Sequence, residues 1–341
     1  MNSKSKKIVI YGAGSIGCYL GGALISAGHD VTLIGRQRLG DAISLHGMRI
    51  TDWQGRNQKF EAGNINYSLD DSILKQADYV LLTVKSGDTQ AAASVLSENV
   101  LSDTVIVSFQ NGVRNADIIS NVLPDNEVLR GMVPFNVFYK GDGHFHCGTE
   151  GNLALESNNG VEEELLQCFL AANLPIDTYD NLEGVQWSKL VMNLNNAVNA
   201  LSGRPLVEQL NDKGYRKVMA AVIQEALNVT SASKIRLERT GKVIPSILPY
   251  ILKLPTWLFK RVASAMLKID PAARSSMYED LQLGRKTEID FLNGEIVKLA
   301  KKTGQSAPAN SIIVEMIKEA ESKQQGTPNL SSADLQKQVL T

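Results

Sequence analysis

The chain has 341 residues, of which 43% are hydrophobic and 21% are charged, and its formal net charge is −1. This length exceeds what one hydrophobic core usually supports, so we expect two domains. The near balance of acidic and basic residues argues against a nucleic-acid-binding protein and gives no reason to expect a membrane surface as a partner.

The three cysteines, Cys18, Cys147 and Cys168, are scattered along the chain without the spacing of metal ligands. We interpret them as small hydrophobic residues in a reducing compartment and expect no metal site. The first residues run directly into a strand-like segment, without a separate apolar signal and cleavage site. No apolar run approaches the ~18 residues that a membrane span needs. These features predict a cytoplasmic protein, and its oligomeric state, monomer or homodimer, stays open.

Short apolar runs alternate with helical patterns up to about residue 180. We expect strands at 7–14, 29–35, 77–84, 104–112 and 127–133, with helices between several of them, as at 15–28 and 86–99. Repeated alternation of strand and helix predicts a mostly parallel sheet with helices on both faces. We therefore predict an α/β Rossmann domain, doubly wound, over residues 1–180.

The first predicted strand ends in GAGSIG, which places Gly12, Gly14 and Gly17 in G-x-G-x-x-G spacing. The motif closes a strand and opens a helix, which is the context in which it binds a dinucleotide. The first glycine allows a tight turn, the second lets backbone approach a pyrophosphate, and the third lets helix pack on strand. The N–H groups of the helix N-terminus then face the phosphates. We assign six residues to cofactor binding: Gly12, Ala13, Gly14, Ser15, Ile16 and Gly17.

The end of the second strand bears on the choice between NAD and NADP. NAD-binding versions of this fold usually place an Asp or Glu there to accept from the ribose 2′-OH. This strand instead ends in LIGRQR, with Arg36 and Arg38. A guanidinium attracts a 2′-phosphate and can bind it through two hydrogen bonds, so NADP is favoured. Arg38 is equally well explained as a solvated surface residue.

Polar residues also follow the next two strands. Lys85 stands at the end of VLLTVK, and Asn111 precedes Gly112 in VSFQNG. Either could be ordinary surface charge or a simple turn. Because ligands of such sheets collect beyond the carboxyl ends of the strands, we favour a functional role for both.

After residue 180 the strand patterns stop and helical periodicity takes over, with candidate helices at 182–201, 207–238, 243–268, 272–303 and 309–322. We predict an all-α domain over residues 181–325 that carries substrate-binding and catalytic residues. Residues 326–341 are rich in Gln, Ser and Asn, and we expect them to be a poorly ordered tail.

The segment WSKLVMNLNN, residues 187–196, carries a polar stripe on an apolar helix. At about 100° per residue, Lys189, Asn193 and Asn196 fall within roughly 60° of one another. A solvent-facing stripe is the simpler explanation. However, Asn is a poor helix former, and an exposed face normally uses Glu, Lys, Gln or Arg. We therefore favour a hydrogen-bonding wall of a cleft. A second cluster, with Ser276 and Glu288, fits a solvated face as well as a site.

These motifs together resemble the ketopantoate reductase (2-dehydropantoate 2-reductase) family, from residue 7 to about residue 322. The resemblance rests on GAGSIG, Lys85, QNG at 110–112, W-x-K-L-x-x-N at 187–193 and SSM…D…TEID…NG at 275–294. It implies an N-terminal Rossmann domain and a helical C-terminal domain. It also implies NADPH-dependent reduction of a small branched 2-oxo acid, ketopantoate, to the 2-hydroxy acid pantoate, a step of pantothenate synthesis.

The resemblance also implies roles for single residues. Lys189 matches the catalytic lysine, the general acid, and Glu288 matches an acidic residue that contacts cofactor or substrate. Asn193 and Ser276 match substrate-binding residues. Residues that match cofactor contacts are Arg36, at the 2′-phosphate, and Lys85 and Asn111, near the nicotinamide, where Asn111 also meets substrate.

Two departures from the family pattern leave the substrate open. The family usually has a second asparagine four residues after the first, but Ala197 stands there, so we expect Asn196 to replace it. Residues 240–270 are longer and more apolar than the usual connection and could be a lid, an oligomer contact or core. One alternative is therefore a relative that acts on another, bulkier 2-oxo acid, with NAD as a further possibility for its cofactor. An alternative of a different class is a non-catalytic NADPH-binding sensor.

Overall fold

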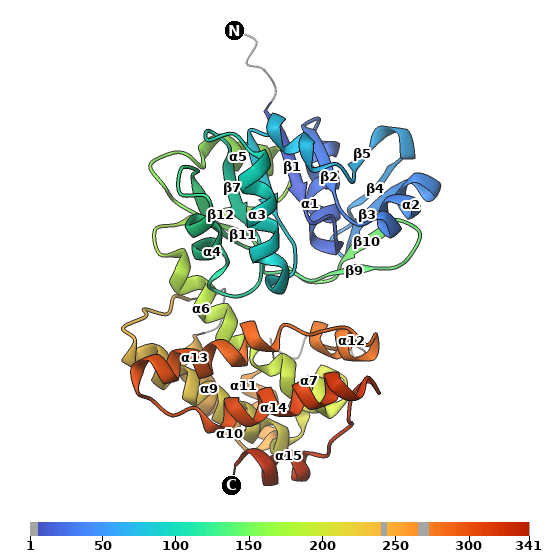
Figure 1. Ribbon diagram of the computed structural model, residues 1–341. Coiled ribbons are helices and arrows are strands. Elements are labelled where there is room, and N and C mark those ends of the chain that lie inside the picture. Colours follow the sequence, from blue (N-terminus) through green and yellow to red (C-terminus); the bar gives the residue numbers. More distant parts are fainter. Residues whose placement is uncertain (1–5, 240–243, 265–272, 341) are drawn as a thin grey trace. The chain divides into compact units, whose positions relative to one another are not determined.

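The computed structural model describes residues 6–239, 244–264 and 273–340. The chain forms two compact units, Met1–Glu183 and Gly184–Thr341 (Figure 1). The first contains all the strands of the described chain, and the second contains helices only. An α/β domain followed by an all-α domain is the predicted fold class, and it is confirmed.

The first unit is built on an eight-stranded sheet in the order β12-β11-β8-β7-β6-β1-β2-β5. Neighbouring strands are parallel throughout, except for the antiparallel pair β8–β11. The strands are β1 (Lys7–Tyr11), β2 (Asp30–Ile34), β5 (Asn66–Ser68), β6 (Tyr79–Leu82), β7 (Val105–Ser108), β8 (Val128–Met132), β11 (Leu153–Glu156) and β12 (Ile176–Tyr179).

Both faces of this sheet are buried, because its strands are apolar at consecutive positions. In β1, Ile8 and Ile10 belong to one apolar cluster, while Val9 belongs to the other. Helices α1 (Ser15–Ser26) and α5 (Glu163–Ala171) contribute to the first cluster, and α3 (Thr89–Asn99) and α4 (Asn115–Val122) to the second. Alternate side chains of a strand point to opposite faces, so helices cover the sheet on both sides, as in doubly wound folds.

A second sheet of four strands, in the order β4-β3-β10-β9, was not predicted from the sequence. Its strands are β3 (Met48–Asp52), β4 (Asn57–Phe60), β9 (Val137–Tyr139) and β10 (His144–Cys147), and it follows helix α2 (Gln37–His46). The pair β3–β10 is parallel, and the other two pairs are antiparallel.

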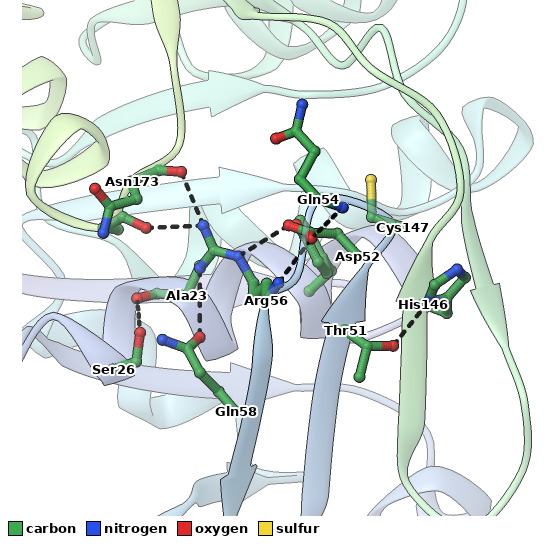
Figure 2. Close-up of polar contacts among 12 residues, drawn as sticks. Ala23, Ser26, Thr51, Asp52, Gln54, Arg56, Gln58, His146, Cys147 and Asn173 are labelled. Carbon is green, nitrogen blue, oxygen red and sulfur yellow. Dashed lines mark hydrogen bonds and ion pairs between the residues drawn. The ribbon is translucent and has the colours of Figure 1, made fainter.

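Arg56 attaches this second sheet to the main sheet's helices (Figure 2). Its guanidinium donates to the carbonyls of Ala172 and Asn173 at the end of α5, at 3.2 and 2.8 Å. It also forms an ion pair with Asp52 at 3.5 Å, and both side chains are largely buried. The cation thereby meets the carbonyls that a helix C-terminus leaves without helical donors.

The second unit consists of helices around α9 (Lys213–Ala232), which contacts most of the others. These are α6 (Leu182–Asn193), α7 (Asn195–Ser202), α8 (Leu206–Asn211), α10 (Leu248–Lys253), α11 (Thr256–Val262), α12 (Ser276–Gln282), α13 (Asn293–Thr303), α14 (Pro308–Lys323) and α15 (Ser332–Val339). No helix in the described part of the chain is long and apolar enough to cross a membrane.

The apolar segment 240–270 is described only over 244–264, and the rest of it lies outside the described residues. Its described part is two short helices, α10 and α11, with Leu252 and Phe259 buried. The guanidinium of Arg216, which is fully buried, donates to the carbonyls of Leu252 and Leu254 at 3.0 Å each. This part of the segment therefore packs on α9 and contributes to the core.

The prediction of a poorly ordered tail over residues 326–341 is wrong. These residues contain α15, which is capped by the Ser331 hydroxyl and packs on α9 and α14. The N–H of Leu330 donates to the Leu201 carbonyl at 2.9 Å, and Leu335 is fully buried. The polar composition misled the prediction because two buried apolar residues, Leu335 and Val339, are sufficient to dock a short helix.

We expect Leu335→Ala to lower the free energy of unfolding by about 2–4 kcal/mol, because it deletes a fully buried side chain. The control is Leu340→Ala, in the same tail, where the side chain is 42% exposed and the expected loss is small. Chemical denaturation of both variants measures this difference. Equal stability of the two variants would mean that α15 does not dock.

Candidate functional site

The glycine-rich loop lies between β1 and α1, at the carboxyl end of the parallel strands. Gly12 has a φ of +103°, a conformation that residues with a side chain rarely adopt. The Ile34 carbonyl accepts from the N–H groups of Gly12 and Ala13 at 2.9 and 2.8 Å. The Thr83 hydroxyl donates to the Gly12 carbonyl at 2.7 Å. The ends of β2 and β6 thus hold the loop in one shape.

The three glycines of the motif are required for different reasons. A Cβ on Gly12 would lie 2.6 Å from the Val84 nitrogen, and one on Gly17 would lie 2.6 Å from the Gly12 carbonyl oxygen. By contrast, a Cβ on Gly14 would meet only the Gly12 oxygen, at 3.9 Å. Gly14 is exposed, so its missing side chain leaves room for a ligand directly above the loop. The loop and the first turn of α1 therefore fit a pyrophosphate.

Arg36 lies two residues after the end of β2 and immediately before the first residue of α2. Its side chain is 90% exposed and forms an ion pair with Asp88 at 3.4 Å. Asp88 belongs to the short helix η3 (Ser86–Asp88) after β6. An exposed pair of this kind contributes little to stability, at most about 1 kcal/mol. The guanidinium can therefore exchange Asp88 for a phosphate, and Asp88 competes with such a ligand. Arg38 is also exposed.

Lys85 and Asn111 follow neighbouring strands, β6 and β7. Lys85 is exposed and precedes η3, and Asn111 is partly buried. The side chains of Ser86 and Asn115 both donate to the Asn111 carbonyl, at 2.7 and 2.6 Å. These bonds join the two loops. The first unit therefore gathers the glycine loop, Lys85 and Asn111 at one edge of its sheet, as the sequence predicted for the strand ends.

In the second unit, Lys189 and Asn193 lie on α6 and Asn196 on α7. All three are partly buried, while their neighbours Leu190, Leu194 and Ala197 are buried. The polar stripe thus runs over two consecutive helices that are packed into the protein on other faces. Ala197 is fully buried, so the position at which the family usually has an asparagine faces the interior.

The asparagines of this segment fall into two pairs with different surroundings. Asn195 accepts from Gln209 at 2.6 Å, and Asn199 donates to the same Gln209 at 2.9 Å. Within the part of the chain that the structure describes, the side-chain amides of Asn193 and Asn196 make no hydrogen bond. Asn195 and Asn199 are therefore held in place by Gln209.

Burial lowers the pKa of Lys189 from 10.5 to about 8, and the negative charge of Glu288 opposes this effect by raising it. Lys189 comes from α6, and Glu288 precedes the short helix η5 (Ile289–Phe291). An amine in apolar surroundings prefers to be neutral, whereas a neighbouring carboxylate favours its charged form. The result is an ammonium that can release its proton near neutral pH.

Ser276, the first residue of α12, is exposed, and its neighbour Ser275 is buried. Ser275 caps α12 and donates to the Asn196 carbonyl at 3.0 Å, while its N–H donates to the Asn199 side chain at 2.9 Å. Ser276 is thereby held next to the turn of α7 that carries Asn196. Sequence reasoning missed Ser275 and Asn199, although the serine before an apolar helical pattern is a recognisable cap.

Two family models match this chain: "Ketopantoate reductase PanE/ApbA" over residues 8–160 and "Ketopantoate reductase PanE/ApbA C terminal" over residues 181–321. The 2-dehydropantoate 2-reductase of Pyrococcus horikoshii is 30% identical over 328 residues, which covers 93% of this chain and 98% of the relative. The corresponding protein of Archaeoglobus fulgidus is 25% identical, with 93% and 98% covered.

A solved structure of a PanE/ApbA family ketopantoate reductase from Ralstonia eutropha JMP134 superimposes with a TM-score of 0.80. It is 32% identical and covers 94% of this chain and 99% of its own. A ternary structure of D-mandelate dehydrogenase with NADH and anilino(oxo)acetate has a TM-score of 0.77 at 21% identity, with 93% and 99% covered, and shows a shared fold.

We expect Gly14→Ala to fold normally but to bind nicotinamide dinucleotides at least about tenfold more weakly. The new methyl group would stand in open space above the loop, where the pyrophosphate must approach. The control is Gly63→Ala, where an added Cβ meets nothing within 4 Å and the position lies outside the loop. Fluorescence titration with the reduced dinucleotides measures the affinities. Unchanged binding in Gly14→Ala would exclude the loop as the pyrophosphate site.

Proposed function

The chain belongs to the ketopantoate reductase family, and on this premise we propose that it reduces 2-dehydropantoate to pantoate with NADPH. Membership makes the chain an oxidoreductase that acts on a CH–OH group with a nicotinamide cofactor. The observation that carries the proposal is Lys189, a partly buried lysine whose pKa is lowered to about 8 beside Glu288. A non-catalytic sensor would have no use for such a group.

Lys189 is the proposed general acid. When bound, NADPH supplies the hydride that reduces the C2 carbonyl. The Lys189 ammonium stabilises the negative charge that develops on the carbonyl oxygen and then gives that oxygen a proton. Because the pKa of Lys189 is about 8 rather than 10.5, the ammonium is mostly present at pH 7 and releases its proton more readily.

Glu288 keeps Lys189 protonated, because its charge raises the pKa of Lys189 against the effect of burial. We propose that Glu288 also contacts cofactor or substrate. Asn193, Asn196 and Ser276 of the second unit are proposed to hold the substrate's carboxylate and hydroxyl groups. Amides and hydroxyls can make these hydrogen bonds without adding charge that would lower the pKa of Lys189 further.

The first unit is proposed to bind NADPH through six loop residues and three side chains beyond the strands: Gly12, Ala13, Gly14, Ser15, Ile16, Gly17, Arg36, Lys85 and Asn111. The preference for NADPH rests on Arg36 after β2, where the segment LIGRQR contains no Asp or Glu that could accept from a ribose 2′-OH. Asp88 pairs with Arg36, and we expect its negative charge to oppose the 2′-phosphate.

A second candidate function is reduction of a bulkier 2-oxo acid. Ala197 stands where the family usually has a substrate-binding asparagine and is fully buried, so the amide would have to come from Asn196, at a different position on α7. A panel of 2-oxo acids of increasing size, each assayed with NADPH and NADH, separates the two candidates. The first predicts the highest kcat/KM with 2-dehydropantoate and NADPH. No turnover of any 2-oxo acid would contradict both.

We expect Arg36→Ala to weaken NADPH binding about 10- to 100-fold and NADH binding less than about threefold, because only NADPH has the 2′-phosphate. Asp88→Asn removes the competing carboxylate and is expected to tighten NADPH alone. Dissociation constants for both dinucleotides measure these effects. Similar losses for NADPH and NADH in Arg36→Ala would remove the assignment of Arg36 to the phosphate.

We expect turnover of the wild-type enzyme to fall as pH rises through about 8, since only the protonated lysine can act as the acid. Lys189→Ala should lower kcat about 100- to 10,000-fold and abolish this pH dependence. Lys189→Arg keeps the charge but not the transferable proton, so it should be slow and independent of pH in this range.

Glu288→Gln serves as the matched variant for the pH profile. Removing its negative charge lowers the pKa of Lys189 further, so the fall in activity should begin at lower pH. A wild-type profile that stays flat through pH 8, or that survives in Lys189→Ala, would contradict the assignment of Lys189.

A further inference from the structure

The loops after β6 and β7 are joined by a chain of buried polar side chains in the first unit. Its members are among the least exposed polar residues of the protein, at 0 to 5% exposure: Ser86, Thr89, Ser108, Gln110 and Asn115. None of them is among the residues to which we assign a role in binding or catalysis. Buried polar groups cost free energy unless every one is hydrogen-bonded, so such a chain needs a reason.

The hydrogen bonds of this chain run in one direction. Ser108 donates to Gln110 Oε1 at 2.9 Å, and Gln110 Nε2 donates to Thr89 Oγ1 at 2.8 Å. The Thr89 hydroxyl then donates to Asn115 Oδ1 at 2.9 Å, and Asn115 Nδ2 donates to the Asn111 carbonyl at 2.6 Å. Each hydroxyl or amide thus fixes the orientation of the next one.

Two further bonds exclude the flipped orientation of the amides. Gln110 Nε2 also donates to the Val84 carbonyl at 3.0 Å, and Asn115 Nδ2 also approaches Ser86 Oγ at 3.3 Å. Turning the Gln110 amide over would place its oxygen against the Val84 carbonyl oxygen, with no proton between them. The network therefore has a single arrangement.

This chain of hydrogen bonds ends at the backbone of Asn111. The Asn111 carbonyl accepts from both Asn115 and Ser86, and the following residue, Gly112, has a φ of +88°. In the other loop, the Gln110 amide donates to the carbonyl of Val84, the residue immediately before Lys85. The backbones of two proposed site residues, on two separate loops, are thereby fixed relative to each other from the buried side.

We propose that this chain is a positioning device for Asn111 and Lys85, and that Thr89 is its central positioning residue. Thr89 lies in the middle of the chain of hydrogen bonds, between Gln110 and Asn115. Its hydroxyl transmits the geometry, since it accepts from Gln110 and donates to Asn115 at the same time. The kinetic part of this inference rests on the proposed reductase function.

Thr89→Val tests the proposal because valine keeps the shape of threonine and removes only the hydroxyl. The matched control is Thr104→Val, in the same unit. Thr104 is also buried, and its hydroxyl donates to the Ala77 carbonyl at 2.8 Å. Thr104 precedes β7, whereas the Asn111 loop follows β7. Thr89→Ser restores the hydroxyl. Amide hydrogen exchange of residues 110–115 and the kinetics with NADPH are measured for all three variants and the wild type.

We expect Thr89→Val to speed exchange of the amides in residues 110–115 and to lower kcat about 10- to 100-fold, with a larger isotope effect from deuterated NADPH. Thr89→Ser should stay near the wild type in both measurements. Thr104→Val should change overall stability but neither measurement.

Equal exchange and equal kcat in Thr89→Val and Thr104→Val would overturn the proposal. If the wild type reduced no 2-oxo acid, the proposed function would fail, while hydrogen exchange would still decide whether Thr89 holds the Asn111 loop.

Discussion

The ammonium of Lys189, withdrawn from water beside the carboxylate of Glu288, is the interaction on which the proposed chemistry depends. Burial alone would favour a neutral amine that could not act as an acid at neutral pH. The carboxylate alone would hold the proton too tightly. Their opposition sets the pKa of Lys189 at about 8. The apolar neighbours of Lys189 on α6 and the uncharged side chains of Asn193, Asn196 and Ser276 preserve this balance, because none of them adds a charge.

The first unit uses a different principle, which is fixed backbone geometry. The positive φ of Gly12, the contacts that exclude side chains at Gly12 and Gly17, and the buried chain through Thr89 all shape loops at the carboxyl ends of parallel strands. Backbone groups and dipoles that are already in place can stabilise a developing charge without rearranging during the reaction. Arg36, with its exposed ion pair to Asp88, is held loosely, which suits the proposed exchange of Asp88 for a phosphate.

The sequence predicted the features that depend on neighbouring residues, and it missed those that depend on contacts between residues far apart in the chain. The glycine loop and the stripe of Lys189, Asn193 and Asn196 are local patterns, and both are found on the predicted elements. The second sheet was missed because its short strands pair across the chain: Thr51 bonds to His146, which is 95 residues away. Asn195 and Asn199 differ from Asn193 and Asn196 because they bond to Gln209, which lies on another helix. The docking of α15 depends on its packing against α9. Neither contact can be recognised from a short stretch of sequence.

The pKa of Lys189 can be measured directly in the folded protein, by NMR of ¹³C-methylated lysines assigned through Lys189→Arg. The proposed chemistry requires a pKa of about 8 for this lysine and a further decrease in Glu288→Gln. A Lys189 that titrates near 10.5 and does not respond to loss of the Glu288 charge would contradict it.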